Sequence, residues 1–484
     1  MALTLIAAIF VLAVALGLLS RYGRKMDLEQ WALGRRGFGA VFVFLLMAGE
    51  IYTVFTFLGA SGYAYGLGAP AFYILAYGAL AYALGYWLLP PISRYAKQHG
   101  LITQADFFAH RFANRELGIA VGLIGVVAML PYLALQLEGL GLIVEVATGR
   151  AIGAQLAIVI GTAGLVVYVV ASGIRASAWT SVVKDILILA VAVFLGVYLP
   201  LHASGGIGPM FQRLAETHPQ LFTLHTPQGT VWFMSTVLVS VLGFWMWPHA
   251  FAYIAAARDE NVFRKNAVVL PLYQLFMLFI LFVGFAAIEI VPGLKNSDLA
   301  LLAATVATLP GWVTGLVGGA GILAALVPGS LLLIVTATLL AKNGLALIPA
   351  FAGERRIELA ARFLVVPIAV AAAAFAIYGS TGIVALLLLG YSYVVQLFPA
   401  LVLGFAARRL VTTPGVFAGL ACGVALLTLL TLTHRHIVQL LPLLPQGLVG
   451  LNDGIAALVV NIVALVLVSV ATGGRWRAAD AEAA

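Results

Sequence analysis

Charged residues are scarce in this sequence. Asp, Glu, Lys and Arg together make up 9% of the 484 residues, against roughly 25% in an average soluble domain. Hydrophobic residues make up 63%, and a soluble fold of this length could not remove so much apolar surface from water. The composition therefore excludes an ordinary soluble protein and indicates one that is embedded in a bilayer.

Cysteine is almost absent as well. The single cysteine, Cys422, lies within an apolar run, which excludes an intramolecular disulfide framework and a Cys-rich metal site. His202, His218 and His225 fall in one polar connection, and no H-E-x-x-H spacing occurs. Because a membrane-embedded enzyme needs acids, histidines or a nucleophile converging at one depth, the sequence disfavours that class.

What the sequence has in abundance is long apolar runs. A helix of about 20 apolar residues crosses the roughly 30 Å of hydrocarbon in a bilayer. We therefore expect an all-α polytopic membrane protein that forms a single transmembrane domain over residues 1–484. The sequence predicts thirteen spans, at approximately 3–20, 38–66, 69–92, 117–146, 151–171, 179–200, 229–254, 267–291, 312–343, 360–378, 381–406, 414–432 and 453–472.

The net charge of +8 is explained by topology rather than by nucleic-acid binding. Most Lys and Arg residues fall in alternate connections between the predicted spans, and basic connections remain on the cytoplasmic side. This asymmetry predicts an N-terminus outside and a C-terminus in the cytoplasm. The first run has no charge before it and several after it, which favours a retained anchor over a cleaved signal peptide.

The spans are predicted to form two repeats of five helices, at 38–200 and 229–406, preceded by an extra helix at 3–20 and followed by two helices within 414–472. Since five is odd, the two repeats are inverted, as in many transporters whose first helix in each half is interrupted. Glycines alone can mark close helix packing, and a proline can mark a simple kink. Residues that can interrupt a helix occur in both first helices: Gly49, Gly59, Gly62, Gly66, Gly243 and Pro248.

Four segments resemble a known family. They are TFLGASGYAYG at 56–66, GIRASAWTSVVKDIL at 173–187, MWPH at 246–249 and TATLLAKN at 336–343. Together they are similar to the sodium/solute symporter family, and within it to the bacterial monocarboxylate permeases. The resemblance implies a leucine-transporter-like fold, alternating access, cation-driven uptake of a small organic solute, and a place in the bacterial cytoplasmic membrane.

The resemblance also implies a sodium site. Its ligands would be the backbone carbonyls of Gly49, Tyr52 and Ala324, together with two hydroxyls on the ninth span. Those last two positions hold Val327 and Pro328, which have no hydroxyl, so that Ser330 would have to substitute. Because a hard cation needs oxygen ligands, the coupling ion, Na⁺ or H⁺, is left open.

The segment at 173–187, which leads into the predicted span at 179–200, departs from the family pattern too. Ser181 and Lys184 stand where many relatives have Asp and Gln. Lys184 and its neighbour Asp185 are adjacent on a helix and do not face each other. We therefore expect each to have a different partner.

Several side chains are candidates for binding the substrate. The resemblance implies that Thr56 contacts it, and Thr53 shares a helical face with Gly49 and Tyr52. The other candidates have structural alternatives, since aromatic residues can simply pack and a buried histidine can simply be hydrogen-bonded. The substrate candidates are Thr53, Thr56, Tyr132, Gln136, Trp245, Trp247 and His249.

Glu50 is the residue that most needs a function. It has about ten uncharged residues on either side, and a carboxylate in the middle of a span is costly unless it faces a cavity, finds a partner or is protonated. Three interpretations remain open. Glu50 carries a coupling proton, or it shapes a cation site beside Gly49, or it is a neutral structural residue hydrogen-bonded to a neighbour such as Thr53.

The sequence therefore predicts a cation-coupled symporter for a small organic solute, a monocarboxylate in the first instance and an amino acid or vitamin as the alternative. A transporter-like sensor or a membrane enzyme is the alternative from a different class. We expect a small-molecule substrate and membrane lipids as partners, with no cofactor, no nucleic acid and no obligatory protein partner.

Overall fold

The computed structural model describes residues 2–21, 40–149, 151–172, 174–224, 229–351, 353–379, 382–406, 411–441 and 445–473. The basic connection after the first helix, at 22–39, and His225 lie outside these ranges. Helices are the only regular elements among the described residues, apart from an isolated bridge at Ala257. The α-helices are α1 (Ala2–Arg21), α3 (Ala40–Gly49), α4 (Ala60–Leu67), α5 (Tyr73–Gln98), α6 (Gln104–Arg111), α7 (Arg115–Ala147), α8 (Ala154–Ser172), α9 (Ile174–Ser204), α10 (Ile207–Thr217), α11 (Thr230–Gly243), α12 (Pro248–Ala256), α13 (Asn261–Gln274), α14 (Met277–Ile290), α15 (Ala300–Thr308), α16 (Gly311–Asn343), α17 (Glu354–Tyr378), α18 (Ile383–Val394), α19 (Phe398–Ala406), α20 (Thr413–Thr433), α21 (Ile437–Leu440) and α22 (Asp453–Ala471).

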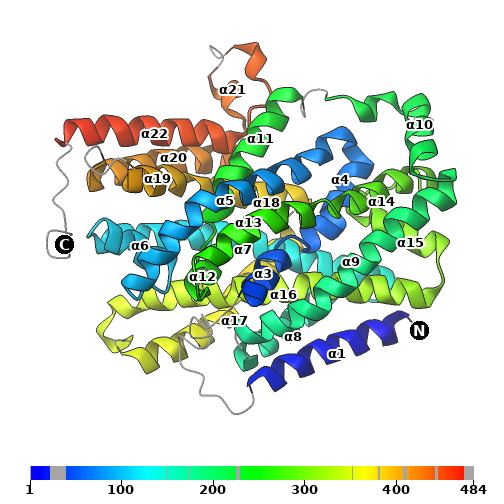
Figure 1. Ribbon diagram of the computed structural model, residues 1–484, viewed down its shortest axis with the longest axis horizontal. Coiled ribbons are helices and arrows are strands. Elements are labelled where there is room, and N and C mark those ends of the chain that lie inside the picture. The colour runs from blue at the N-terminus through cyan, green and yellow to red at the C-terminus, as the bar shows by residue number, and fades with distance from the viewer. Residues whose placement is uncertain are drawn as a thin grey trace.

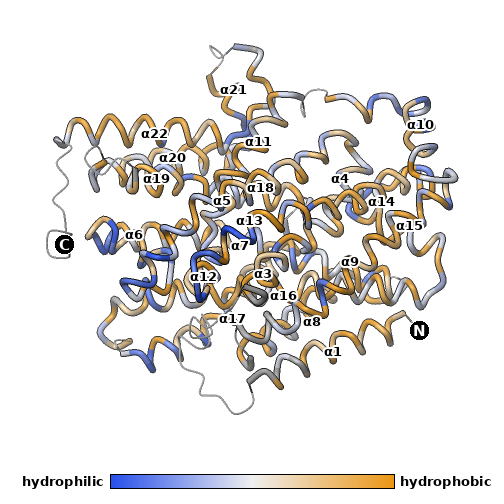
Figure 2. The backbone as a smooth tube through the Cα atoms, in the orientation of Figure 1, coloured by the Kyte–Doolittle hydropathy of each residue, from blue (hydrophilic) through white to orange (hydrophobic). Residues whose placement is uncertain are grey.

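The helices pack into one bundle around α16 (Figure 1). This helix packs against α1, α7, α9 and α17, and its most apolar stretch is entirely buried. α20 and α22 lie side by side at one edge of the bundle. Hydrophobic residues follow the helices through the body of the bundle, whereas hydrophilic residues gather on short peripheral segments such as α6 and α10 (Figure 2).

The protein is an integral membrane protein by the length and apolarity of its helices. Among the described residues, nine helices are long and apolar enough to cross a bilayer, or ten if α11 and α12 form one bent span. α1 and α8 contain shorter apolar stretches. The thirteen spans, the two inverted repeats and the orientation of the termini stay predictions.

The first predicted interruption lies directly after Gly49. α3 ends at that residue, residues 50–53 are not helical, and a π-helical turn at Phe55–Gly59 leads into α4. The glycines further along serve close packing instead. A Cβ on Gly62 would lie 2.7 Å from the carbonyl oxygen of Ser297, so only glycine lets α4 approach that connection.

The second interruption lies at Pro248. α11 ends at Gly243, a 3₁₀ turn follows at Phe244–Met246, and Trp247 is extended before α12 begins at Pro248. Proline suits the first position of a helix because its missing N–H would have no partner there. The two halves of this span meet at 48°.

Candidate functional site

The backbone groups freed by the first interruption are satisfied by polar side chains. The Thr53 N–H donates to Thr56 Oγ1 at 2.9 Å, and that hydroxyl donates to the Thr53 carbonyl at 3.0 Å. The Phe55 N–H donates to Thr53 Oγ1, and the Val54 N–H donates to Gln136 Oε1 from α7. Three predicted substrate ligands, Thr53, Thr56 and Gln136, therefore hold the interrupted backbone in place.

Glu50 lies in the same interruption and faces the second one. Its Oε2 accepts a hydrogen bond from the Tyr132 hydroxyl at 3.2 Å and lies 3.1 Å from His249 Nε2. The side chains of Glu50 and His249 are only 6% and 4% exposed. Tyr132 and His249, rather than Thr53, are thus the partners of this carboxylate.

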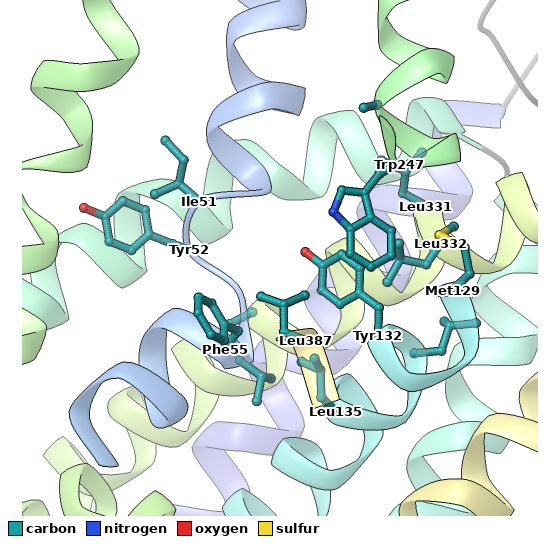
Figure 3. Packing of buried hydrophobic residues seen from close by; sticks show 14 of the residues in the cluster. Ile51, Tyr52, Phe55, Met129, Tyr132, Leu135, Trp247, Leu331, Leu332 and Leu387 are labelled. Atoms are coloured by element: carbon teal, nitrogen blue, oxygen red, sulfur yellow. The ribbon is translucent and has the colours of Figure 1, made fainter. Parts of the chain in front are cut away.

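These side chains line a narrow and mostly aromatic cavity of about 20 Å³. The rings of Tyr132 and Trp247 lie 5.0 Å apart, and Tyr391 packs against Trp247 at 5.3 Å. Figure 3 shows Tyr132 and Trp247 beside each other, with Tyr52 on the other side of the interrupted chain. His249 Nδ1 is buried without a hydrogen-bond partner. The cavity is lined by Glu50, Phe55, Tyr77, Tyr132, Phe244, Trp247, His249, Tyr253, Leu387 and Tyr391.

A larger hollow of about 470 Å³ lies further along the same helices. On α18, Ile383 and Val384 line the hollow, whereas Leu387 and Tyr391 line the aromatic cavity. On α7, Glu138 lines the hollow, six residues or roughly 9 Å of helix rise from Tyr132. The two spaces therefore succeed each other along one direction.

In the other direction α6 covers the bundle. Its Asp106 forms an ion pair with Lys342 at the end of α16 and accepts a hydrogen bond from Asn343 Nδ2 at 2.9 Å. Gln104 Nε2 donates to the Met246 carbonyl at 2.8 Å. Burial alone would raise the pKa of Asp106, but Lys342, Asn343 and the Thr103 N–H together hold it below its usual value. Asp106 is therefore a carboxylate that ties α6 to α16.

The carbonyls predicted to bind sodium are contacted by a lysine. Lys184 on α9 is fully buried, and its Nζ donates to the Gly49 carbonyl at 2.6 Å and to the Tyr52 carbonyl at 3.0 Å. The same Nζ lies 3.0 Å from Asp185 Oδ1. The expectation that these adjacent residues have different partners is wrong, because the long lysine side chain bends back to its neighbour.

The three predicted cation ligands on α16 are all buried; they are Ala324, Val327 and Ser330. The Ser330 hydroxyl donates to the Val327 carbonyl of its own helix at 2.7 Å. Pro328 has no N–H to offer to the carbonyl four residues earlier, which belongs to Ala324. Whether these groups hold a cation stays a prediction.

The structure separates the remaining candidates. Trp247 and His249 line the aromatic cavity, but Trp245 donates its indole N–H to the Ala81 carbonyl at 2.7 Å. Sequence reasoning missed Tyr77 and Tyr391, because a single tyrosine in an apolar run does not indicate whether it lines a cavity or packs in the core. It also missed the contact of Lys184, although that residue stood out from the family pattern.

Solved structures with the same fold are transporters. The structure of a substrate-bound, outward-open Na⁺-coupled sialic acid symporter matches with a TM-score of 0.78 at 14% identity, covering 97% of both chains. A nucleobase-cation-symport-1 family transporter matches with a TM-score of 0.59 at 16% identity, covering 92% of this chain and 95% of that one. The leucine-transporter-like fold is thereby confirmed.

Relatives in sequence are named as transporters too. The uncharacterized symporter YhjB of Bacillus subtilis is 50% identical over 100% of this chain and 99% of its own length, and YodF of the same species is 32% identical over 96% and 92%. A monocarboxylate transport permease protein of Rhizobium johnstonii is 28% identical over 86% of each chain. The sequence profile of the sodium:solute symporter family matches residues 31–423. The chain therefore belongs to the sodium:solute symporter family, whose members are transporters rather than enzymes.

Proposed function

We propose that the protein imports a small monocarboxylate together with a cation, by alternating access. The observation that carries this proposal is the buried Glu50–His249 pair, with His249 Nδ1 left unpartnered in an aromatic cavity between the two interrupted helices. Aromatic rings surround the non-polar part of a small solute, and a few convergent polar atoms fix its orientation.

The chemistry of the pair links an anion to a proton. The starting state is a Glu50 carboxylate that accepts from Nε2–H of a neutral His249. When the pair takes up one more proton, its net charge becomes zero and Nδ1 carries a hydrogen. That N–H donates to an incoming carboxylate in a charge-assisted hydrogen bond. Without the extra proton, Nδ1 is a bare lone pair beside a carboxylate and repels the anion. A carboxylate and one positive charge are thus expected to enter together.

Among the described residues that line the cavity with this pair, four are tyrosines and none is a second acid. Tyr77, Tyr132, Tyr253 and Tyr391 come from α5, α7, α12 and α18 and line the same cavity. Their hydroxyls can donate to a solute carboxylate but carry no charge of their own near neutral pH. The charge balance of the cavity is therefore set by Glu50, His249 and the solute.

The size of the spaces fits a small solute. A cavity of about 20 Å³ has room for a water or two, so a solute enters only when the aromatic rings move. The hollow of about 470 Å³ beyond Tyr132 and Leu387 offers the approach. With the N-terminus outside, as the charge pattern predicts, this hollow faces the exterior of a bacterial cytoplasmic membrane and α6 closes the cytoplasmic side.

One relative supports the proposed substrate class: a protein 28% identical to this chain is named a monocarboxylate transport permease. Membership of the family implies coupling to Na⁺ for the family at large, and the coupling ion of this chain is a separate question. An amino acid, the alternative solute, would place its ammonium group against Glu50 and its carboxylate against His249.

The test is uptake into proteoliposomes that contain the purified protein. Labelled pyruvate, lactate, acetate and propionate are offered with an inward gradient of protons or of sodium, and alanine is offered in parallel. We expect accumulation of at least one monocarboxylate but not of alanine. His249→Gln should abolish it, because the amide that donates to Glu50 turns its oxygen to the cavity. The matched control, His202→Gln at an exposed position, should accumulate normally. Accumulation of alanine alone, or of no solute, would contradict the proposal.

A further inference from the structure

The ammonium group of Lys184 lies at the first interruption. Its side chain is 0% exposed. Nζ donates to the Gly49 carbonyl at 2.6 Å and to the Tyr52 carbonyl at 3.0 Å, and it forms an ion pair with Asp185, whose Oδ1 lies 3.0 Å away. An ammonium group has three donors and no acceptor. Two of these donors are used by the carbonyls, and the positive charge is paired with the Asp185 carboxylate.

The position of this ammonium is one that attracts cations. α3 ends at Gly49, and the negative end of its helix dipole points into the interruption. The Met47 and Ala48 carbonyls accept from the Glu50 and Ile51 N–H groups, whereas the Gly49 and Tyr52 carbonyls accept from Lys184. In lipid such groups need a donor or an ion. In transporters built on interrupted helices, unwound carbonyls of this kind coordinate the coupling cation.

We infer that Lys184 is a tethered cation that takes the place of a sodium ion at the Gly49 and Tyr52 carbonyls. A sodium ion at the two carbonyls would lie against the ammonium group that already contacts both. The Asp185 carboxylate balances one positive charge, and a second one there would be unpaired in the protein interior. Sodium therefore does not fit this site while Lys184 is present.

The other half of the expected site agrees with this inference. Val327 and Pro328 have no hydroxyl, and the hydroxyl of Ser330 donates to the carbonyl of Val327. The two positions at which the resemblance implies hydroxyls therefore have none, and α9 supplies a positive charge to the carbonyls at the other half of the site. Both differences point the same way, because an ammonium held by two carbonyls and a carboxylate does not need the oxygen ligands that a hard cation requires.

Removing the ammonium should open the site to sodium. Lys184→Ala leaves the two carbonyls and the Asp185 carboxylate around an empty volume, whereas Lys184→Met fills the volume without a charge. The experiment measures the Tm of each purified variant in sodium chloride against choline chloride at equal ionic strength. Lys265→Ala is the matched control, because Lys265 is exposed on α13.

We expect Lys184→Ala to gain a saturable, sodium-specific rise in Tm that exceeds any response of the wild type, of Lys265→Ala and of Lys184→Met. A sodium response of Lys184→Ala that is equal to or weaker than that of the wild type would overturn the inference. If Lys184→Ala is unstable in choline, sodium should restore its folding. Lys184→Ser, which adds a hydroxyl oxygen in the place of the ammonium, is then the second variant. If sodium restores the folding of neither Lys184→Ala nor Lys184→Ser, the inference is overturned as well.

This inference goes beyond the proposed function and does not depend on the identity of the solute. The measurement contains no solute and no transport step. A protein that fails to accumulate monocarboxylates can still show the gain of sodium binding, and a protein that transports them can fail to show it. The two tests are therefore separable.

Discussion

The imidazole of His249 meets the carboxylate of Glu50 across the two interrupted helices, with Nε2 3.1 Å from Oε2. Glu50 lies in the break between α3 and α4, and His249 lies in the first turn of α12. Each helix alone would leave a polar group buried at high cost. Together they form one polar centre whose position depends on both breaks.

Glu50→Gln should separate exchange from accumulation. The glutamine keeps the shape of Glu50 and can still accept from Tyr132, but it can neither take up nor release a proton. We expect solute exchange between the two sides of the membrane to survive and accumulation driven by a pH gradient to fail. Both are measured on the same proteoliposomes, with Glu216→Gln on the exposed face of α10 as the control. Full accumulation by Glu50→Gln would remove Glu50 from the coupling mechanism.

Thr56→Val should act on stability before it acts on binding. The change removes a hydroxyl that accepts from the Thr53 N–H and donates to the Thr53 carbonyl. Leaving a buried backbone group without a partner costs about 1–3 kcal/mol, so the Tm and the yield of folded protein should fall. Thr56→Ser keeps the hydroxyl and should behave as the wild type. Equal stability of Thr56→Val and the wild type would show that the interruption does not need this residue.

The two neighbouring tryptophans should give different phenotypes. Trp245 packs against Tyr82 and donates to the Ala81 carbonyl, so Trp245→Ala should destabilise the protein by about 3–5 kcal/mol, as for large core deletions. Trp247 lines the aromatic cavity, so Trp247→Phe should change the order of preferred solutes, with a smaller loss of stability than Trp245→Ala because an aromatic ring is retained. Competition assays with acids of increasing size measure the order. An unchanged order with Trp247→Phe would place the solute elsewhere.

Asp298 should make stability depend on pH. Burial raises the pKa of the Asp298 carboxyl to about 6, and the hydrogen bond that it accepts from the Ile383 N–H offsets part of this rise. An acid with a raised pKa in the folded state contributes stability below the pKa of the unfolded chain, about 3.9. That contribution is lost as the pH rises through about 6.

Asp298→Asn should therefore flatten the dependence of Tm on pH between about 4 and about 6, and it should raise the Tm at neutral pH. The charged groups in the same hollow are Glu138 and Lys295, so the variant is compared with the wild type at constant salt. A steeper dependence in Asp298→Asn than in the wild type would contradict the assignment.

The orientation can be tested with introduced cysteines. The native Cys422 is exposed and is first replaced by serine. Cysteines at Gln220, in the connection after α10, and at Glu354, at the start of α17, are both at exposed positions. The predicted topology places Gln220 outside and Glu354 in the cytoplasm, so an impermeant thiol reagent added to whole cells should label only the former. Labelling of both positions from one side would contradict the thirteen-span arrangement.

The sequence by itself determined the class of the protein and the location of its second interruption. Apolar runs of about 20 residues require a bilayer, and a proline within such a run cannot continue the hydrogen-bond ladder. Both are local properties, so Pro248 could be placed at a break without knowing its neighbours. The family motifs added the fold, because four separated segments agreed.

The sequence could not determine the place of the first break within 49–66. Glycines permit both a break and close packing, and which of the two occurs depends on what approaches them. Gly62 packs against the connection at Ser297, whereas the chain opens after Gly49. Only the tertiary structure distinguishes these cases.

The partners of the buried polar groups were likewise decided by tertiary structure. Glu50 was recognised as needing a partner, but His249 and Tyr132 come from other helices, and no local pattern reports such contacts. Lys184 was noted as unusual, but neighbours along a helix say nothing about where a long flexible side chain ends. Its ammonium reaches the Gly49 carbonyl because α9 packs against α3, and that packing is a property of the assembled bundle.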